Sequence, residues 1–482
     1  MDLSQCELLE RLPDSFGSMT NLHLMDLSGC VKLERLPDSF CNLTNLHHMD
    51  LSRCGKLERL PDSFGTLTNL HHIDLSNCGK LERLPDSFGS LTNLHHMNLV
   101  CCRKLKRLPD SLGNLTNLHH INLTLCRKLE RLPDSFGSLM NLHHLDLSLC
   151  KKLERLPNSF GSCNRIKYLN SSCCSNLTIS SDTLGNIRTL EHIDFSGCGK
   201  IELWPLQLAH QRSLKILKLT GTNIKELPSA IEVPTDLEVL WAGSPLLDTL
   251  YPLLGDLKNL KELRLKDCRE LKCLPASVGR LSQLTQLEVA GCPAIELLFK
   301  KVREQRETVR TLKFNSSIHK YMPCLQELTP QDTEISEVSF DEGVCPNLRK
   351  FILRECINLV EVGTLPNTLT YVKVSSCYNL RSIEGLSGLA MLQSLVIRKC
   401  NELHELLSVK TLVALESLYA IDCVKLKSIR ELAQLTKPSH LDVSGCLELE
   451  KLEGVEYCRS LFQVVARRCP KLQGVPNWLR ES

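Results

Sequence analysis

Residues 46–69 read LHHMDLSRCGKLERLPDSFGTLTN, a unit that sets the organisation of the chain. The same 24-residue pattern begins again at Leu70, Leu94, Leu118 and Leu142. With residue 46 as position 1, apolar residues occupy positions 1, 4 and 6, and a cysteine occupies position 9. Position 9 recurs at an unbroken spacing of 24 as Cys6, Cys30, Cys54, Cys78, Cys102, Cys126, Cys150, Cys174 and Cys198. A fixed internal period of this length is the signature of a chain built from stacked repeats.

The pattern L-x-x-L-x-L-x-x-C, the leucine-rich-repeat pattern, predicts one short strand in each unit. Positions 4 and 6, here Met49 and Leu51, are expected to point into the core. Positions 3, 5 and 7, here His48, Asp50 and Ser52, therefore point outward. We predict an α/β leucine-rich-repeat solenoid of about twenty repeats, in the form of a horseshoe or arc. Its concave side carries a parallel β-sheet, and its convex side carries irregular or 3₁₀ segments.

The rest of each unit is expected to return over the convex side of the solenoid. Leucines and the phenylalanine at position 19 keep the core filled, and Pro61 fixes the turn. Asp62 or Ser63 is expected to cap a short helical or 3₁₀ turn.

The repeats beyond residue 200 diverge from this unit but persist. Position 9 is then assigned to Thr222, Pro245, Cys268, Cys292, Cys356, Cys377, Cys400, Cys423, Cys446 and Cys469. The repeat register is poor between Phe299 and Asn347. We therefore predict a solenoid over residues 1–299, with regular 24-residue repeats to about residue 220. An irregular segment or break is expected over 300–347, and a continuation of the solenoid over 348–482.

Composition excludes several classes of function. The 58 Lys and Arg nearly balance the 55 Asp and Glu, and aromatic residues make up 5% of the chain. Nucleic-acid binding is therefore disfavoured. No apolar run reaches the roughly 18 residues needed to cross a membrane. The N-terminal sequence lacks the basic and apolar regions of a signal peptide. We expect a cytoplasmic protein, or one shared between cytoplasm and nucleus.

The 25 cysteines could form a metal array, a redox switch, stacked disulfides or a structural column. Seventeen of them are assigned to position 9, nine before residue 200 and eight after it, where each side chain turns inward. No CxxC pair competes with a structural role. We therefore predict reduced, buried thiols in a reducing compartment. In the pairs Cys101–Cys102 and Cys173–Cys174, one sulfur of each pair lies outside the column and could be reactive.

Histidines form a second repeated feature on the expected concave face. Position 3 holds His48, His72, His96, His120 and His144 in five consecutive repeats. Position 2 of the same repeats holds His47, His71, His95, His119 and His143. Recent duplication of one repeat, with histidine a tolerated surface residue, is the reading we favour. A pH-sensitive binding face and a metal site are the alternatives.

No arrangement in the sequence predicts catalysis or a cofactor. His48, Asp50 and Ser52 share one face, but the aspartate lies between the other two, whereas a catalytic triad needs the histidine in the middle. Histidine and serine would lie roughly 13 Å apart along the strand. No GxxxxGK[ST] phosphate loop occurs. We predict a non-enzymatic protein that binds no cofactor.

The outward positions change in character along the chain, and this is the best indication of a binding surface. Arginine and aromatic side chains that face outward are typical of protein interfaces. Together with the five position-3 histidines, the predicted protein-binding residues are Trp241, Arg264, Lys266, Arg354, Tyr371, Lys373, Arg398 and Tyr419. Trp241, at position 5 of its repeat, is the first candidate for mutation.

The repeats resemble those of plant intracellular immune receptors of the nucleotide-binding leucine-rich-repeat family, which run L-x-x-L-x-L-S-x-C-x-x-L-x-x-L-P. The matching residues in one unit are Leu70, Ile73, Leu75, Ser76, Cys78, Leu81, Leu84 and Pro85. The resemblance implies a sensor region that binds a pathogen effector or a guarded host protein, and that restrains a nucleotide-binding domain. No counterpart of that domain is found in this sequence. The alternative is a free-standing cytosolic adaptor or substrate-recognition subunit.

The first residue, Met1, falls at position 4 of a repeat. A solenoid that starts within a strand exposes the end of its core unless something covers it. We therefore expect this solenoid to belong to a larger protein.

Overall fold

The structure is a computed structural model, and the chain divides into two units that we describe separately. The structure describes residues 1–180, 183–184, 187–202, 213–227, 236–250, 252–271, 274, 276–292, 311–314, 324–341, 343, 345–406, 409–435, 437–458 and 463–474. The first unit comprises Met1–Ile224 and Ile231–Leu237. The second comprises Lys225–Ala230 and Glu238–Ser482.

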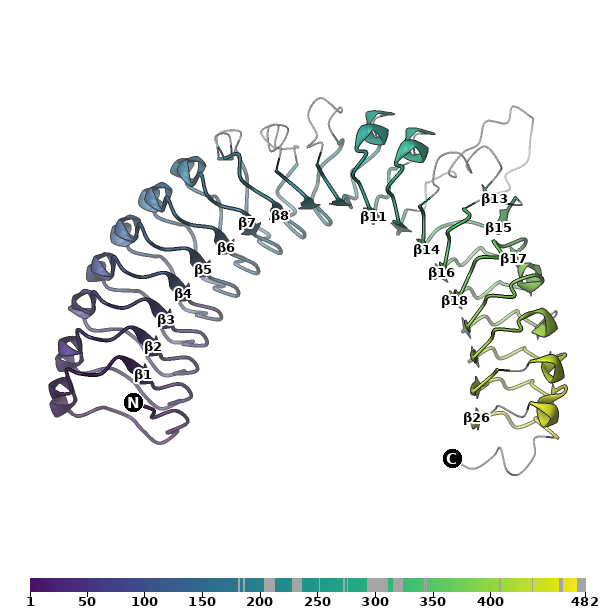
Figure 1. Cartoon of the computed structure of the whole chain (residues 1–482), viewed down its shortest axis with the longest axis horizontal. Coiled ribbons are helices and arrows are strands. Elements are labelled where there is room, and N and C mark those ends of the chain that lie inside the picture. The colour runs from purple at the N-terminus through teal and green to yellow at the C-terminus, as the bar shows by residue number, and fades with distance from the viewer. Residues whose placement is uncertain are drawn as a thin grey trace. The chain divides into compact units, whose positions relative to one another are not determined.

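The first unit is a regular stack of repeats with one short strand each (Figure 1). Its described strands are β1 (Leu24–Asp26), β2 (His48–Asp50), β3 (His72–Asp74), β4 (His96–Asn98), β5 (His120–Asn122), β6 (His144–Asp146), β7 (Tyr168–Asn170), β8 (His192–Asp194) and β9 (Ile216–Lys218). Each strand pairs in parallel with the next at the same repeat position, as His48 does with His72. The period of 24 thus becomes a sheet in which equivalent side chains form columns.

Short 3₁₀ helices lie on the side of the first unit opposite the strands (Figure 1). They are η1 (Asp14–Ser18), η2 (Asp38–Asn42), η3 (Phe64–Thr66), η4 (Asp86–Ser90), η5 (Asp110–Asn114), η6 (Asp134–Ser138) and η7 (Asn158–Ser162). Parallel strands opposite 3₁₀ helices confirm the predicted leucine-rich-repeat fold.

The core of each repeat lies between its strand and its 3₁₀ helix. Met49 and Leu51 are at most 2% exposed, as the alternation predicts, and Phe64 is fully buried. Burying a side chain of this size contributes about 1.5–3 kcal/mol. Because each repeat supplies the same set of buried apolar side chains, the core continues from one repeat to the next.

The cysteine column is buried as predicted, except at its two ends, where Cys6 is exposed and Cys469 is half-buried. The Cys54 thiol donates a hydrogen bond to the backbone oxygen of Leu27, with 3.3 Å between sulfur and oxygen. Cys78 bonds in the same way to Leu51 at 3.2 Å. The assignment of Pro245 to this column is wrong, because Ser244 is 3% exposed and occupies the buried place one residue earlier.

The predicted side-chain capping is also wrong. The residue before η3, Ser63, makes no capping hydrogen bond with its side chain. The next repeat supplies a different contact, in which the Gly65 backbone N–H donates to the Ser87 hydroxyl at 3.1 Å. A Cβ added at Gly65 would lie 1.9 Å from the Ser87 carbonyl oxygen. Glycine is therefore required here by the close approach of neighbouring repeats.

We expect Gly65→Ala to destabilise the protein by about 1–3 kcal/mol, because the new methyl group meets backbone that cannot move aside cheaply. Urea unfolding of the two proteins measures the difference. Gly55→Ala is the matched control, since a Cβ there meets nothing within 4 Å. Equal losses in both variants would contradict the close-approach explanation.

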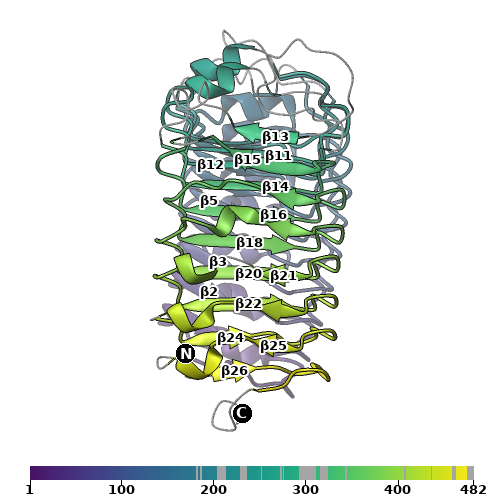
Figure 2. The ribbon, with the colours of Figure 1, turned by 90° about the vertical axis from the view of Figure 1, so that its right-hand side faces the viewer.

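The second unit continues the same construction with longer strands, which lie stacked in Figure 2. Its long sheet contains β10 (Val239–Trp241), β11 (Glu262–Lys266), β12 (Gln286–Ala290), β14 (Glu327–Gln331), β16 (Lys350–Arg354), β18 (Tyr371–Ser375), β20 (Ser394–Arg398), β22 (Ser417–Ile421), β24 (His440–Asp442) and β26 (Gln463–Val465). Neighbouring described strands of this set pair in parallel, as β16 does with β18 and β18 with β20.

Two smaller parallel sheets and further 3₁₀ helices complete the second unit. One sheet contains β13 (Thr311–Phe314), β15 (Glu337–Phe340), β17 (Glu361–Val362) and β19 (Ser382–Ile383). The other contains β21 (Glu405–Leu406), β23 (Ser428–Ile429) and β25 (Lys451–Leu452). The 3₁₀ helices are η10 (Pro252–Asp256), η11 (Ala276–Arg280), η12 (Glu384–Leu386), η13 (Val409–Thr411), η14 (Leu432–Gln434) and η15 (Val455–Tyr457).

The segment 300–347, in which we expect a break, is only partly described. Residues 300–310 and 315–323 lie outside the described residues. In the described part, β14 pairs in parallel with both β12 and β16. A break within 300–347 stays a prediction. Separately, no helix among the described residues has the length and apolar character needed to span a bilayer.

Candidate protein-binding face

The outward residues at positions 3, 5 and 7 of the long-sheet strands form what we call the sheet face of each unit. Strand alternation places these side chains outside, since the residues between them are buried. All thirteen predicted binding residues belong to long-sheet strands: five histidines in the first unit and eight other residues in the second. The two faces differ in charge and in the contacts of their side chains.

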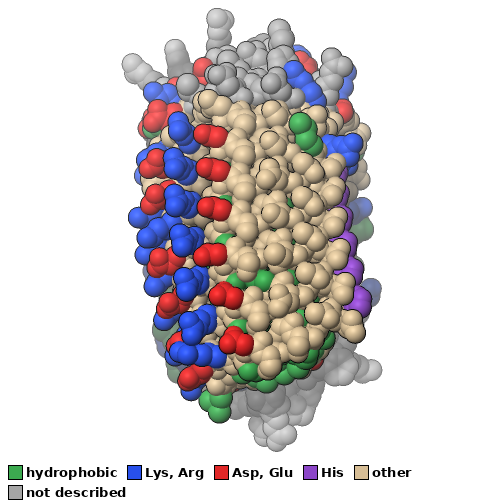
Figure 3. Space-filling model, turned by 90° about the vertical axis from the view of Figure 1, so that its left-hand side faces the viewer, with side chains coloured by type: hydrophobic (Ala, Val, Ile, Leu, Met, Phe, Trp, Pro, Cys, Tyr) green, Lys and Arg blue, Asp and Glu red, His purple; other side chains and the backbone are tan. Residues whose placement is uncertain are grey.

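Stacked imidazoles run along the sheet face of the first unit. The rings of His48 and His72 lie 4.5 Å apart, and those of His72 and His96 also lie 4.5 Å apart. The column continues to His120 and His144 with centroid distances of 5.2 and 4.1 Å. The position-2 histidines form a second stack at 5.2–5.3 Å. Figure 3 shows histidines in a row along one edge of this unit.

Four of the five position-3 histidines have a lowered pKa, which favours the neutral form of their rings. Burial, and to a smaller extent the neighbouring histidines, lower the pKa of His72 to about 4. Burial also lowers the pKa of His96 and His120, again with help from neighbouring histidines. For His144 burial is the main cause, and Asp146 opposes it. Neutral rings can stack at these distances, whereas imidazolium rings would repel one another.

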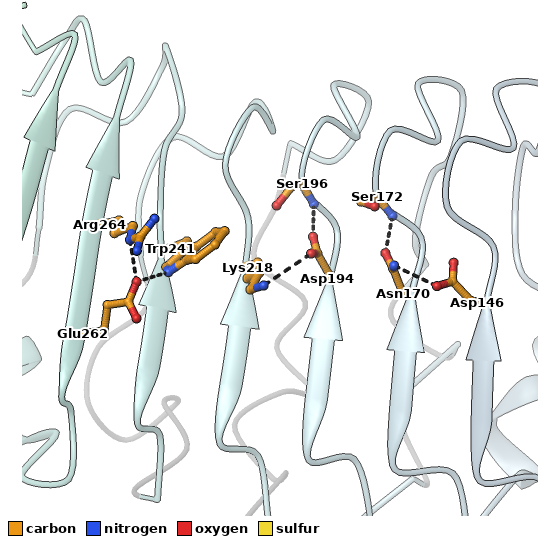
Figure 4. Close-up of polar contacts among 9 residues, drawn as sticks. All are labelled: Asp146, Asn170, Ser172, Asp194, Ser196, Lys218, Trp241, Glu262 and Arg264. Carbon is orange, nitrogen blue, oxygen red and sulfur yellow. Dashed lines mark hydrogen bonds and ion pairs between the residues drawn. The ribbon is translucent and has the colours of Figure 1, made fainter. Parts of the chain in front are cut away.

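The aspartates at position 5 support the turn that follows each strand. One carboxylate oxygen of Asp50 accepts a hydrogen bond from the Ser52 backbone N–H at 2.7 Å. In Figure 4 the Asn170 side-chain amide donates to Asp146 at 3.1 Å, and Lys218 lies 3.9 Å from Asp194. Among the described residues, no group of three or more His, Cys, Asp or Glu side chains is arranged to hold a metal ion.

Trp241 lies on the sheet face of the second unit within a polar network (Figure 4). Its indole N–H donates to a carboxylate oxygen of Glu262 at 2.8 Å. The Arg264 guanidinium lies over the indole ring, 4.4 Å from its centroid, and is paired with Glu262 and Glu288. The ring is therefore fixed in place, which lowers the entropy lost when a partner binds it.

The other predicted residues of the second unit spread over β11 to β22. Lys266 is exposed at the end of β11. Arg354 ends β16 and Arg398 ends β20, and both are exposed. The remaining three are half-buried, Tyr371 and Lys373 on β18 and Tyr419 on β22. The Tyr419 ring also contacts that of His440, with centroids 5.6 Å apart.

Sequence reasoning missed rows of charge outside the sheet face of the first unit. Figure 3 shows parallel rows of basic and acidic side chains on this unit. Lys80 forms an ion pair with Glu58 of the preceding repeat at 3.4 Å, and Lys104 forms an ion pair with Glu82 at 3.8 Å. The 24-residue period could have predicted these rows, because lysine, glutamate, arginine and aspartate recur at fixed positions of the unit.

Comparison with known proteins agrees with this fold. Residues 10–160 match the family described as a leucine-rich repeat region. The chain is 28% identical over 176 residues to Disease resistance protein RPS4B of Arabidopsis thaliana, covering 36% of this chain and 15% of that protein. It is 27% identical over 182 residues to the protein SUPPRESSOR OF npr1-1, CONSTITUTIVE 1 of the same plant, covering 36% and 12%. The matched part is thus a small fraction of each relative's length.

The matches to solved structures have low sequence identity and TM-scores below 0.5. YopM from Yersinia enterocolitica is 17% identical, with a TM-score of 0.49, and the match covers 97% of this chain and 92% of that one. A leucine-rich-repeat protein of Leptospira interrogans is 24% identical, with a TM-score of 0.46 over 70% of this chain and 90% of that one. The parallel strands and 3₁₀ helices give the chain a leucine-rich-repeat fold, and about a third of its length is similar to Arabidopsis disease resistance proteins.

Proposed function

We propose that this chain is a protein-recognition scaffold, the sensor region of a plant intracellular immune receptor that binds a pathogen effector or a guarded host protein. The observation that carries the proposal is the sheet face of the second unit. Trp241 and Arg264 are held there in one orientation by Glu262 and remain partly exposed. Fixed aromatic and arginine side chains of this kind are frequent binding hot spots.

The similarity to disease resistance proteins supports the immune part of the proposal. In this proposal the solenoid acts with a nucleotide-binding domain whose switching it restrains until the ligand binds. The protein acts in the cytoplasm, where the column thiols stay reduced. We also propose that an irregular segment or break at residues 300–347 divides the solenoid.

We expect Trp241→Ala and Arg264→Glu each to weaken capture of the protein ligand by roughly thirty-fold, as about 2 kcal/mol lost at a hot spot would do. The immobilised chain is exposed to extracts of infected and uninfected plant tissue, and recovered proteins are compared by mass spectrometry. Arg59→Glu, a charge reversal outside the sheet face, is the control and should retain the ligand. Unchanged recovery of every partner by both face variants would contradict the proposal.

A further inference from the structure

Three cationic side chains gather at one place on the sheet face of the second unit. Arg354 ends β16, Lys373 lies in the middle of β18, and Arg398 ends β20. Ser375 of β18 pairs in register with both arginines, so it lies between them. At a strand spacing of about 4.8 Å, the two arginine Cα atoms are about 10 Å apart, and that of Lys373 is about 7 Å from Ser375. We call these three cations the cationic patch.

Among the residues that the structure describes, no acidic side chain is paired with the cationic patch. Within the part of the chain that the structure describes, none of the three cations has a carboxylate within 4.0 Å. Two acidic residues on or beside the neighbouring strands are engaged elsewhere: Glu327 faces Lys350 at 3.9 Å, and Glu355 accepts from the Gln331 amide at 3.3 Å. This differs from β11 of the same unit, where an arginine is paired with two glutamates.

The surroundings of Lys373 strengthen any interaction with an anion. Ile352 and Val396 are its register partners on either side, and Val396 is only 8% exposed. Burial is the main cause that lowers the pKa of the lysine, and Arg354 and Arg398 lower it further. Charges in such a partly dry setting interact more strongly than in open water.

Hydroxyl groups add donors beside the cations. Tyr371 lies on the same face of β18, two residues before Lys373, and Ser375 lies two residues after it. Both arginines act on the pKa of the tyrosine hydroxyl and lower it, although burial raises it more. The hydroxyl therefore lies within electrostatic range of both guanidinium groups.

We propose that the cationic patch binds a phosphate monoester carried by a side chain of the protein that the sheet face recognises. The inference rests on the proposed function, whose ligand it makes more specific. A phosphorylated side chain carries a charge of about −1.5 to −2 near pH 7 and three acceptor oxygens. Two guanidinium groups and one ammonium match that charge and can each bond a different oxygen. A single carboxylate would leave two of the cations without a counter-charge.

Calorimetric titration of the full chain at constant ionic strength tests the inference. The probes are inorganic phosphate and degenerate peptide pools with one central phosphoserine, phosphothreonine or phosphotyrosine, each compared with the same pool unphosphorylated. We expect saturable binding of phosphate, and tighter binding of at least one phosphorylated pool. Phosphate should also raise the melting temperature, because it binds only the folded chain.

The variants identify the groups responsible. Lys373→Met and the double variant Arg354→Gln/Arg398→Gln should each weaken binding at least tenfold. Lys350→Met, which removes a cation of the same face that already has a carboxylate partner, should change binding less than twofold. Lys373→Met should melt at the same or a higher temperature than the wild type in phosphate-free buffer, because it relieves repulsion between like charges. This separates loss of binding from loss of fold.

Any of four results would overturn the inference. The first is that phosphate and all phosphorylated pools bind no better than chloride, and the second is that they bind equally to wild type and Lys373→Met. The third is that inositol hexakisphosphate binds while no phosphorylated pool exceeds inorganic phosphate, which would identify a free phosphorylated molecule as the ligand. The fourth is that capture of the protein ligand is lost in Trp241→Ala but survives both phosphatase treatment and Lys373→Met. In that last case the proposed function stands and only the phosphate inference fails.

Discussion

We expect a thiol reagent to label the native protein rapidly at Cys173 and at Cys6, the exposed first member of the position-9 column, and to leave the rest of the column almost untouched. Both fast sites are exposed, whereas the column cysteines from Cys30 to Cys198 are buried. Burial raises the pKa of Cys54 from 9.0 to about 12, which lowers its thiolate fraction at neutral pH about a thousandfold. The thiolate is the reactive form, so slow labelling follows from both access and ionisation. Mass spectrometry of timed, quenched samples measures the rate at each site.

Two adjacent residues provide a matched comparison for this labelling experiment. Cys173→Ser should remove a large part of the fast phase, because this thiol lies outside the column. Cys174→Ser should leave the fast phase intact, since the Cys174 thiol is buried and bonds the Leu147 backbone oxygen at 3.1 Å. In 6 M guanidinium all 25 cysteines should react. Rapid labelling of most column thiols in the native protein would contradict an inward-facing column.

The sequence was sufficient to predict the fold because the same two constraints, strand alternation and a constant spacing, apply in every regular repeat. Strand alternation correctly placed Met49 and Leu51 inside and His48 outside. The constant spacing of 24 also predicted that equivalent residues would align, as His48 does with His72. Where the spacing changes, the same reasoning failed by one residue, and Ser244 rather than Pro245 fills the buried place.

The contacts of the candidate site were less predictable, because they depend on rotamers and on which strands are neighbours. The outward position of Trp241 followed from its place in the repeat. Its bond to Glu262 did not, since that residue is 21 positions away and comes into reach only through strand pairing. The same limit applies to the cationic patch, whose three members come from three different repeats. That no described carboxylate pairs with these cations could be established only from the positions of the surrounding acids.

We expect the first unit to lose stability as the pH falls from about 6.5 to about 4, because of the position-3 histidines. The pKa of His72 is lowered from 6.5 in the unfolded chain to about 4 in the folded one. In that window the unfolded chain binds more protons than the folded chain, so acid favours unfolding. The stability that the neutral ring provides is fully present above pH 6.5 and is lost as the pH passes down through the folded-state pKa. Burial lowers the pKa of His96 and His120 in the same direction.

Thermal unfolding followed by circular dichroism measures this effect in buffers from pH 7.5 to pH 4.5. We expect the melting temperature to fall by roughly 2–8 °C over this range, as a loss of about 1–2 kcal/mol would produce in a domain of this size. Replacing the five position-3 histidines with glutamine should remove a large part of that fall, because glutamine does not titrate. A matched variant with glutamine at the five position-2 histidines loses as many stacked rings but retains the position-3 column. It should keep most of the pH dependence.

Salt separates ring repulsion from the other acid-sensitive groups of the unit. At His144 the Asp146 carboxylate raises the pKa and opposes the effect of burial. Once protonated, stacked imidazolium rings 4.1–5.2 Å apart repel one another, and added salt screens that repulsion where the rings are exposed. At pH 5, salt should therefore raise the melting temperature of the wild type more than that of the position-3 glutamine variant. If the two variants and the wild type lose stability in parallel as the pH falls, the histidine column is a by-product of repeat duplication. If only the position-3 variant resists acid, the column gives this unit its sensitivity to pH.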